Sequence, residues 1–223
     1  MRKKFWGLLG ILIISLSFTN VYAREIVNAG DNIIQEGVYD STRIVAGNII
    51  DNKAYVDGLS LVFGNQITLE GSSTYGAYAG NNVIIEEQVE KDMFVAGNSI
   101  TIANNAIIGR DVYIAGNSVI INADIARDLR FAGSSINLSG ITVNGDAYIY
   151  AEEIILDANT IIVGKLTYSG DCIITGLDVA SIGSVKVKEY EDINIEFNIY
   201  DSVWSFIASV ISSFIVMVAL FFV

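Results

Sequence analysis

The feature that most limits how this chain can fold is a sequence that repeats itself at intervals of 16 to 19 residues. The stretch "RDVYIAGNSVIIN" at 110–122 nearly repeats "KDMFVAGNSITIA" at 91–103, and "RDLRFAGSSINLS" follows at 127–139. The glycine of the AGN-like turn marks each copy, and the markers are Gly30, Gly47, Gly64, Gly80, Gly97, Gly116, Gly133, Ala151 in place of glycine, and Gly170. These markers define nine repeats that fill residues 24–177, so the interior of the chain is one repeat array.

Apolar residues recur two positions before each marker and three and five positions after it. The first column contains Val45, Val62, Tyr78, Val95, Ile114, Phe131, Ile149 and Tyr168. The second contains Ile33, Ile50, Ile67, Val83, Ile100, Val119, Ile136, Ile154 and Ile173, and the third contains Leu69, Ile85, Ile102, Ile121, Leu138 and Leu156. This alternation is the period of a strand, so we expect strands of four or five residues that glycine or asparagine ends.

A strand this short satisfies its backbone groups only when it lies on the equivalent strand of the next repeat. The predicted fold is therefore all-β, a single-stranded parallel β-helix of about nine turns and roughly 40 Å in length. Asparagines follow five markers, and we expect them to adopt left-handed backbone angles and to hydrogen-bond along the rod; they are Asn48, Asn65, Asn81, Asn98 and Asn117. The variation in repeat length is expected at another corner, where "LSGITV" and "LDANTII" lie.

The two ends of the chain predict a membrane-anchored, exported protein. Residues 1–23 combine a basic head with an apolar run and small residues, which indicates a signal peptide. Residues 203–223 form an uncharged stretch of 21 residues, long enough for a transmembrane helix. Residues 24–183 are then the β-helix domain on the extracytoplasmic side of the cell membrane, and 184–202 are a juxtamembrane linker. No basic residue follows the apolar stretch, so we expect the natural chain to continue beyond Val223.

Composition narrows the function classes. The formal net charge of −12 argues against a nucleic-acid partner, which requires a basic surface. The chain has no histidine, which excludes a Ser-His dyad and a histidine-ligated zinc, and no glycine-rich phosphate loop leads into a helix. The single Cys172 has no internal disulfide partner and is expected as a small buried apolar residue. We therefore predict no catalytic residues, no cofactor and no metal.

Two polar or aromatic columns are candidates for binding. The first contains Asp92, Asp111, Asp128 and Asp146, preceded in three cases by Lys91, Arg110 and Arg127. It fits either a carboxylate ladder for Ca²⁺ or glycan chemistry, or a solvated turn in which acid and base rows neutralise one another, and the second interpretation is favoured. The second column contains Phe94, Tyr113, Arg130 and Tyr148 and fits either a stripe that stacks on sugars or a partner, or ordinary surface residues of a sheet.

The stretch "GRDVYIAGNSVIINADIARDLRFAGSSINLSGITVNGDAYI", residues 109–149, resembles the bactofilin family of polymer-forming bacterial cytoskeletal proteins, with weaker echoes over 29–175. The resemblance implies a right-handed β-helix, an architectural role without catalysis or nucleotide, and end-to-end assembly of rods. Bactofilins are typically cytoplasmic, whereas the predicted signal and span indicate an exported member of a bactofilin-like group.

These observations predict a non-enzymatic scaffold of the bacterial cell envelope that self-associates through the ends of its β-helix. The alternative is a β-helix that binds or modifies carbohydrate, such as a cell-wall glycan, at the cell surface. A third hypothesis is an accessory to a sensor or transporter whose activity resides in spans beyond Val223.

Overall fold

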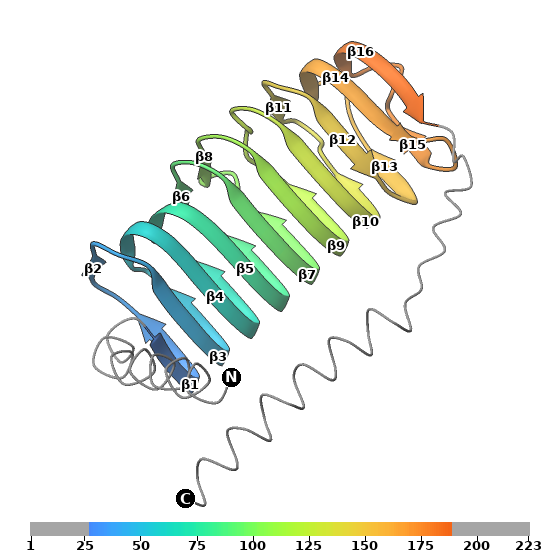
Figure 1. Cartoon of the computed structure of the whole chain (residues 1–223). Coiled ribbons are helices and arrows are strands. Elements are labelled where there is room, and N and C mark those ends of the chain that lie inside the picture. The colour runs from blue at the N-terminus through green and yellow to red at the C-terminus, as the bar shows by residue number, and fades with distance from the viewer. Residues whose placement is uncertain (1–26, 189–223) are drawn as a thin grey trace, which may run out of the picture. The chain divides into compact units, whose positions relative to one another are not determined.

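A computed structural model describes residues 27–188 (Figure 1). The strands are β1 (Val27–Gln35), β2 (Val38–Tyr39), β3 (Arg43–Asn52), β4 (Tyr55–Leu69), β5 (Ser72–Ile85), β6 (Gln88–Val89), β7 (Met93–Ile102), β8 (Ile107–Ile108), β9 (Val112–Ile121), β10 (Leu129–Asn137), β11 (Thr142–Val143), β12 (Ala147–Tyr150), β13 (Glu153–Ile155), β14 (Ile161–Ser169), β15 (Ile173–Thr175) and β16 (Ser181–Lys188). The predicted signal peptide and transmembrane segment lie outside this range. Within it, no helix is long and apolar enough to cross a membrane.

The described residues form a parallel β-solenoid, as the repeat predicts. The long strands stack in the order β1, β3, β4, β5, β7, β9, β10, β12 and β14, and β16 pairs with β14 as the last layer. Every pairing between named strands is parallel, and the markers align in consecutive layers, as in Gly97 on Gly116 and Gly116 on Gly133. The solenoid has about ten turns, one more than predicted, because the chain makes a further turn after the last marker.

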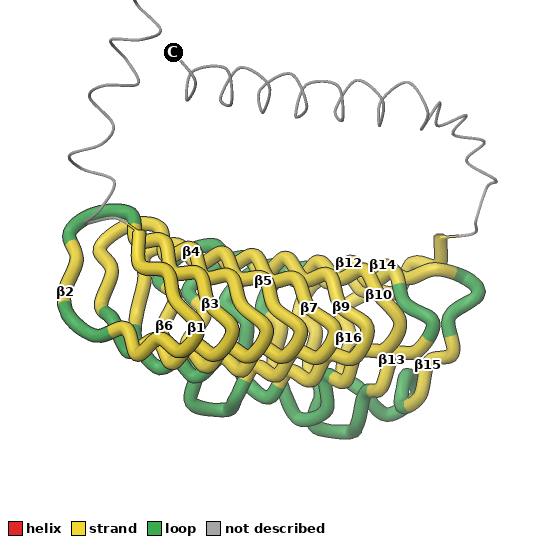
Figure 2. Tube along the Cα trace, turned by 90° about the horizontal axis from the view of Figure 1, so that it is seen from below, coloured by secondary structure: helices red, strands yellow, loops and turns green. Residues whose placement is uncertain are grey.

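The shorter strands complete each turn. Strands β6 and β8 pair on a second side of the coil, where isolated bridges at Ile125 continue their ladder toward Val143 in β11. Loops gather along one edge of the coil in Figure 2. The longest repeat intervals contain the loops at 103–106, 138–141 and 156–160, so the prediction that length varies at one corner is confirmed for the long repeats. The shortest interval, Gly64 to Gly80, departs from the prediction, because the β4–β5 ladder shifts register between Val56 and Leu59.

The prediction that glycine and asparagine end each strand is wrong. Strand β4 runs for 15 residues and passes through its marker, Gly64, without losing its ladder to β3. The markers bend the strand instead, because stacked glycines let adjacent backbones approach closely: a Cβ on Gly97 would lie 2.6 Å from the carbonyl oxygen of Gly80. The asparagines after the markers are exposed and have no left-handed angle, since no non-glycine residue of the described range has a positive φ. They also form no hydrogen-bonded row within that range.

The predicted core columns are confirmed with one exception. Their members from Ile33 to Tyr168 are buried and form one continuous apolar cluster. Ile173, the predicted end of the second column, is instead 69% exposed, and Ile174 pairs with Ile154 in its place. The cause is a turn in which the Cys172 amide donates to the carbonyl of Ser169, which adds one residue to that repeat and shifts the register.

The solenoid also extends past its predicted boundary. Residues 184–188, predicted to begin the linker, form the second half of β16 and pair with β14 from Lys165 to Ser169. The alternation in "SVKVK" therefore belongs to a strand of the rod.

We expect Ile136→Asp to lower the free energy of unfolding by about 4 kcal/mol or more, because it places an unpaired charge in a fully buried column. The matched control is Ile120→Asp, since Ile120 is 41% exposed, and it is expected to cost about 1 kcal/mol or less. Chemical denaturation of the full chain measures both. Equal losses in the two variants would contradict the column assignment.

Candidate functional site

The predicted aromatic column is a continuous stack on the outer face of the coil. The register places Phe94, Tyr113, Arg130 and Tyr148 on neighbouring strands, and we call these four residues the aromatic ladder. The rings of Phe94 and Tyr113 are stacked with centroids 4.6 Å apart. The guanidinium of Arg130 lies 5.2 Å from the centre of the Tyr113 ring and 5.1 Å from that of Tyr148, so the cation sits between two aromatic faces.

A shallow depression of about 640 Å³ lies beside the aromatic ladder. Three alanines, each one residue before a marker, line it: Ala96, Ala115 and Ala132. Ala79 continues the same column toward Phe63, and we call this row of four the alanine trough. The same column carries Phe63 before the alanines and Tyr150 after them, so a large ring stands at each end. The sequence analysis missed this trough, although the run of four small residues between two aromatic ones is readable from the repeat.

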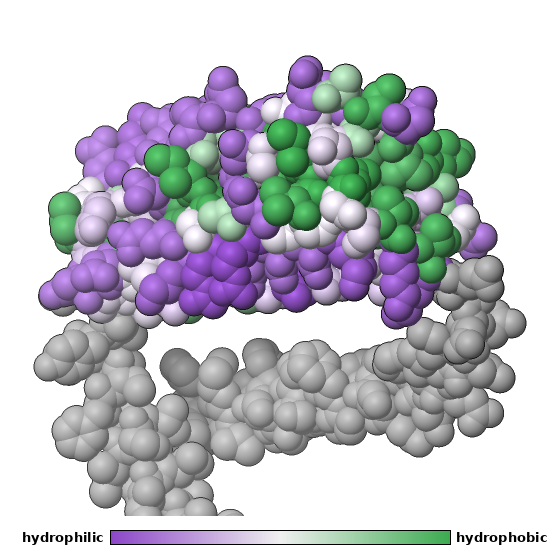
Figure 3. Space-filling view, turned by 90° about the horizontal axis from the view of Figure 1, so that it is seen from above, coloured by the Kyte–Doolittle hydropathy of each residue, from purple (hydrophilic) through white to green (hydrophobic). Residues whose placement is uncertain are grey.

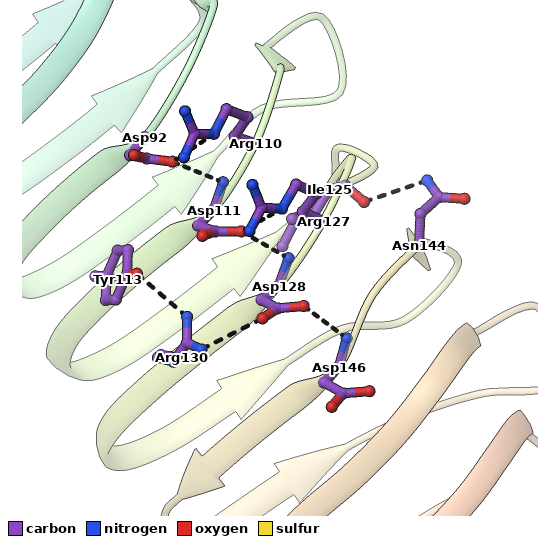
Figure 4. A network of polar contacts seen from close by, with 10 residues as sticks. All are labelled: Asp92, Arg110, Asp111, Tyr113, Ile125, Arg127, Asp128, Arg130, Asn144 and Asp146. Carbon is purple, nitrogen blue, oxygen red and sulfur yellow. Dashed lines mark hydrogen bonds and ion pairs between the residues drawn. The ribbon is translucent and has the colours of Figure 1, made fainter.

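The aspartate column is a structural ladder between turns, shown in Figure 4. The backbone amides of the last three aspartates each donate to the carboxylate of the aspartate one turn earlier, as in Asp128 to Asp111 at 3.2 Å and Asp146 to Asp128 at 2.9 Å. The amide of Lys165 continues the series by donating to Asp146 at 2.8 Å. Each carboxylate therefore satisfies a backbone donor of the following turn, and we call the four residues the aspartate ladder.

Cations neutralise this ladder across turns. Arg110 pairs with Asp92 of the turn before it at 3.2 Å, and Arg127 pairs with Asp111 at 3.3 Å. Arg130 joins the two ladders, since it pairs with Asp128 at 3.3 Å and donates to the Tyr113 hydroxyl at 3.2 Å (Figure 4). These contacts agree with the interpretation in which acid and base rows neutralise one another. Lys91 departs from it, because its ammonium lies 5.0 Å from the centre of the Tyr75 ring.

Two hydrogen-bond donors hold Asp146, the last member of the aspartate ladder, in its charged form. The amide of Lys165 and the hydroxyl of Tyr148 both donate to Asp146, and these bonds lower the pKa of its carboxyl. The described residues hold no cluster of three or more histidine, cysteine or acidic side chains arranged for a metal ion. The carboxylate oxygens of the aspartate ladder thus accept hydrogen bonds from backbone amides and form ion pairs with guanidinium groups.

A buried acid that the sequence analysis missed lies inside the coil. Glu87 is 1% exposed and accepts a short hydrogen bond from the hydroxyl of Tyr78, to which Ser73 is also hydrogen-bonded at 3.2 Å. Burial raises the pKa of Glu87 to about 7. Gly76 makes room for this group, because a Cβ there would lie 2.3 Å from the Tyr78 hydroxyl. The sequence signal that could have identified Glu87 is an acid at an inward position, where the equivalent residues of other turns are Ala54, Ala106 and Ala123.

The N-terminal end of the core is closed by a second polar cluster. Gln35 and Arg43 are buried there, and Gln35 accepts hydrogen bonds from Asn28 at 2.7 Å and from Arg43 at 3.2 Å. The guanidinium of Arg43 also lies 4.5 Å from the centre of the Tyr39 ring. In the first turn, polar side chains therefore replace two of the three apolar columns, whereas Ile33 continues the third.

Cys172 lies near the opposite end of the rod. Its thiol is free and only partly buried, packed against the edge of the core, rather than fully buried as predicted. Partial burial raises its pKa, which makes the reactive thiolate scarcer at neutral pH.

A comparison of the chain with family models, with curated proteins and with solved structures finds no match. The geometry described above is therefore the basis for inferring what the chain does.

We expect Asp128→Ala to destabilise the protein by about 1–3 kcal/mol, because it leaves the amide of Asp146 without its acceptor. Asp128→Asn keeps an oxygen at that position and removes only the exposed pair with Arg130, so its expected cost is about 1 kcal/mol or less. Thermal unfolding of both variants measures the difference. An asparagine variant as unstable as the alanine variant would contradict the amide-acceptor role.

Because the pKa of Glu87 is raised in the folded protein, we expect the free energy of unfolding to fall as the pH rises. Its pKa is about 7 in the folded protein against 4.5 for an ordinary glutamate, so between these values only the unfolded chain releases the proton. The contribution is fully present below pH 4.5 and lost by about pH 7, a change of about 3 kcal/mol at ~1.4 kcal/mol per pKa unit. We expect Glu87→Gln to flatten the stability profile between these pH values, measured by denaturation of the full chain. The control Glu86→Gln, at the adjacent position, should leave the slope in place, and an unchanged slope in Glu87→Gln would contradict the assignment.

Proposed function

We propose that this chain is a non-enzymatic, membrane-anchored scaffold of the bacterial cell envelope that self-associates through the ends of its β-helix. The observation that carries the proposal is the exposed strand edge at each end of the rod. Among residues 27–188, β1 pairs only with β3, and β16 pairs only with β14. An unpaired edge of this kind is a template for another strand.

The C-terminal end of the rod offers the stronger contact for association with another copy. Val185 and Val187 continue inward columns of the core, through their pairing with Leu166 and Tyr168, yet they are 47% and 48% exposed. Apolar side chains gather over the C-terminal half of the face drawn in Figure 3. Two such ends in contact would pair strand edges and remove these valines from water, which favours association.

The N-terminal end offers a weaker contact. Much of its interior is filled by the hydrogen-bonded cluster around Gln35 and Arg43. Stacking another rod on it would therefore remove polar groups from water and cover a single apolar column, the one that begins at Ile33. The ends of the rod are therefore unequal, and the proposed assembly starts at β16.

The remaining parts of the proposal come from the sequence. The predicted signal peptide and transmembrane segment favour an anchored rod outside the cytoplasmic membrane, and the resemblance to bactofilins favours an architectural role. The aspartate ladder supports a non-enzymatic role, because hydrogen bonds and ion pairs already engage its carboxylates. The membrane and further copies of the chain are the proposed partners.

Sedimentation of the full chain across the micromolar range tests the proposal. We expect concentration-dependent assembly, and we expect the double variant Val185→Lys, Val187→Lys to remain monomeric because it places charges on the exposed column ends. Val38→Lys is the matched control at the opposite end, where Val38 is 79% exposed, and it should assemble like the parent chain. Only monomers in the parent chain would overturn the proposal.

A further inference from the structure

We propose that the alanine trough is a binding site for a short segment of uncharged glycan lying along the rod. The proposed site lies on the side of the rod, whereas the proposed self-association uses its ends, so the two proposals are independent. Four observations support it: the length of the trough, its lining, its hydrogen-bonding rims and its charge.

The trough has a defined length. Five strand spacings separate Phe63 from Tyr150, about 24 Å at 4.8 Å per spacing. Rings stand at both ends, and four alanines lie between them. The space suits an extended chain of about four pyranose rings, at roughly one ring per strand spacing.

The lining suits the C–H faces of sugar rings. Alanine methyls form the floor, and the aromatic ladder forms one wall. The open face of the Phe94 ring looks over Ala77, a small residue in the same column, because Tyr113 covers only its other face. An aromatic face next to an open space is a platform on which a flat apolar surface stacks.

Hydrogen-bonding groups lie along one side of this apolar strip and past the glycine bend of its strands. The hydroxyls of Tyr113 and Tyr148 and the guanidinium of Arg130 follow one side. Beyond the glycine bend, Asn98 and Asn117 are exposed, and their side-chain amides make no hydrogen bond to other described residues. A saccharide, with hydroxyls around the edge of an apolar ring face, matches this division better than a lipid chain does.

The charges in the lining and on the chain as a whole favour an uncharged ligand. Arg130 is the one formally charged residue of the lining, and Asp128 pairs with it at 3.3 Å. The chain as a whole carries a formal net charge of −12, which repels an anionic polymer. A second copy of the chain is a poorer occupant, because a twofold contact would set one hollow against another.

Isothermal titration calorimetry of the full chain tests the proposal with three tetrasaccharides: β-linked N-acetylglucosamine, β-linked glucose and an anionic uronate. We expect binding of at least one neutral tetramer and none of the uronate. Ala115→Phe fills the middle of the floor and should raise the dissociation constant at least about tenfold. Ala132→Phe serves the same purpose if the first variant does not fold.

Ala46→Phe is the matched control, because Ala46 lies in the same column beyond Phe63 and outside the trough. Its affinity should stay within about twofold of the parent. Failure of both neutral tetramers to bind, or equal loss in Ala46→Phe and Ala115→Phe, would overturn the proposal. So would a change in sedimentation caused by Ala115→Phe without saccharide, which would identify the trough as a contact between copies. Loss of assembly in the β16 variant with glycan binding intact would show the two properties to be separate.

Discussion

The structure depends on one constraint, the parallel ladder that holds each turn in register with the turns on either side. The ladder places like positions on like positions, so the side chain at any site meets the same position of its neighbours. Buried columns of isoleucine, valine and leucine form in this way, and so do the aspartate ladder and the aromatic ladder. Extra residues are accommodated in a loop, as at residues 103–106, or at a register shift within a strand, as between Val56 and Leu59.

Where a core side chain departs from the repeat, residues within one or two turns provide its hydrogen-bond partner and its space. Tyr78 stands in a column where most turns carry valine or isoleucine. Its hydroxyl needs both a partner and space, which Glu87 and Gly76 supply. This arrangement places a titratable group in the core and links stability to pH. At the N-terminal end, Gln35 and Arg43 satisfy one another in the same way. The first turn therefore carries Gln35 and Arg43, whereas the last carries Val185 and Val187 on inward columns, which makes the two ends of the rod chemically distinct.

Much of the fold was predictable from the sequence because stacking turns a one-dimensional repeat into columns. Residues such as Ile100 and Ile136 are buried for the reason the repeat indicates. Ile173 was misplaced because one inserted residue in a turn reverses which side chains face inward. Strand lengths were underestimated because stacked glycines bend a backbone that stays hydrogen-bonded. A hollow is defined by the difference between neighbouring columns, such as Ala115 beside Tyr113, so a repeat compared column by column does not predict the alanine trough.

The aspartate ladder has a consequence for how such a protein can change in length. Each carboxylate serves the amide of the following turn, so copying one whole turn copies a donor and an acceptor together and leaves neither unpaired. Duplication of a middle turn would lengthen the rod by about 4.8 Å and leave both terminal surfaces unaltered. The spacing between the two ends is thus a modular dimension, adjustable in fixed steps by gene duplication alone.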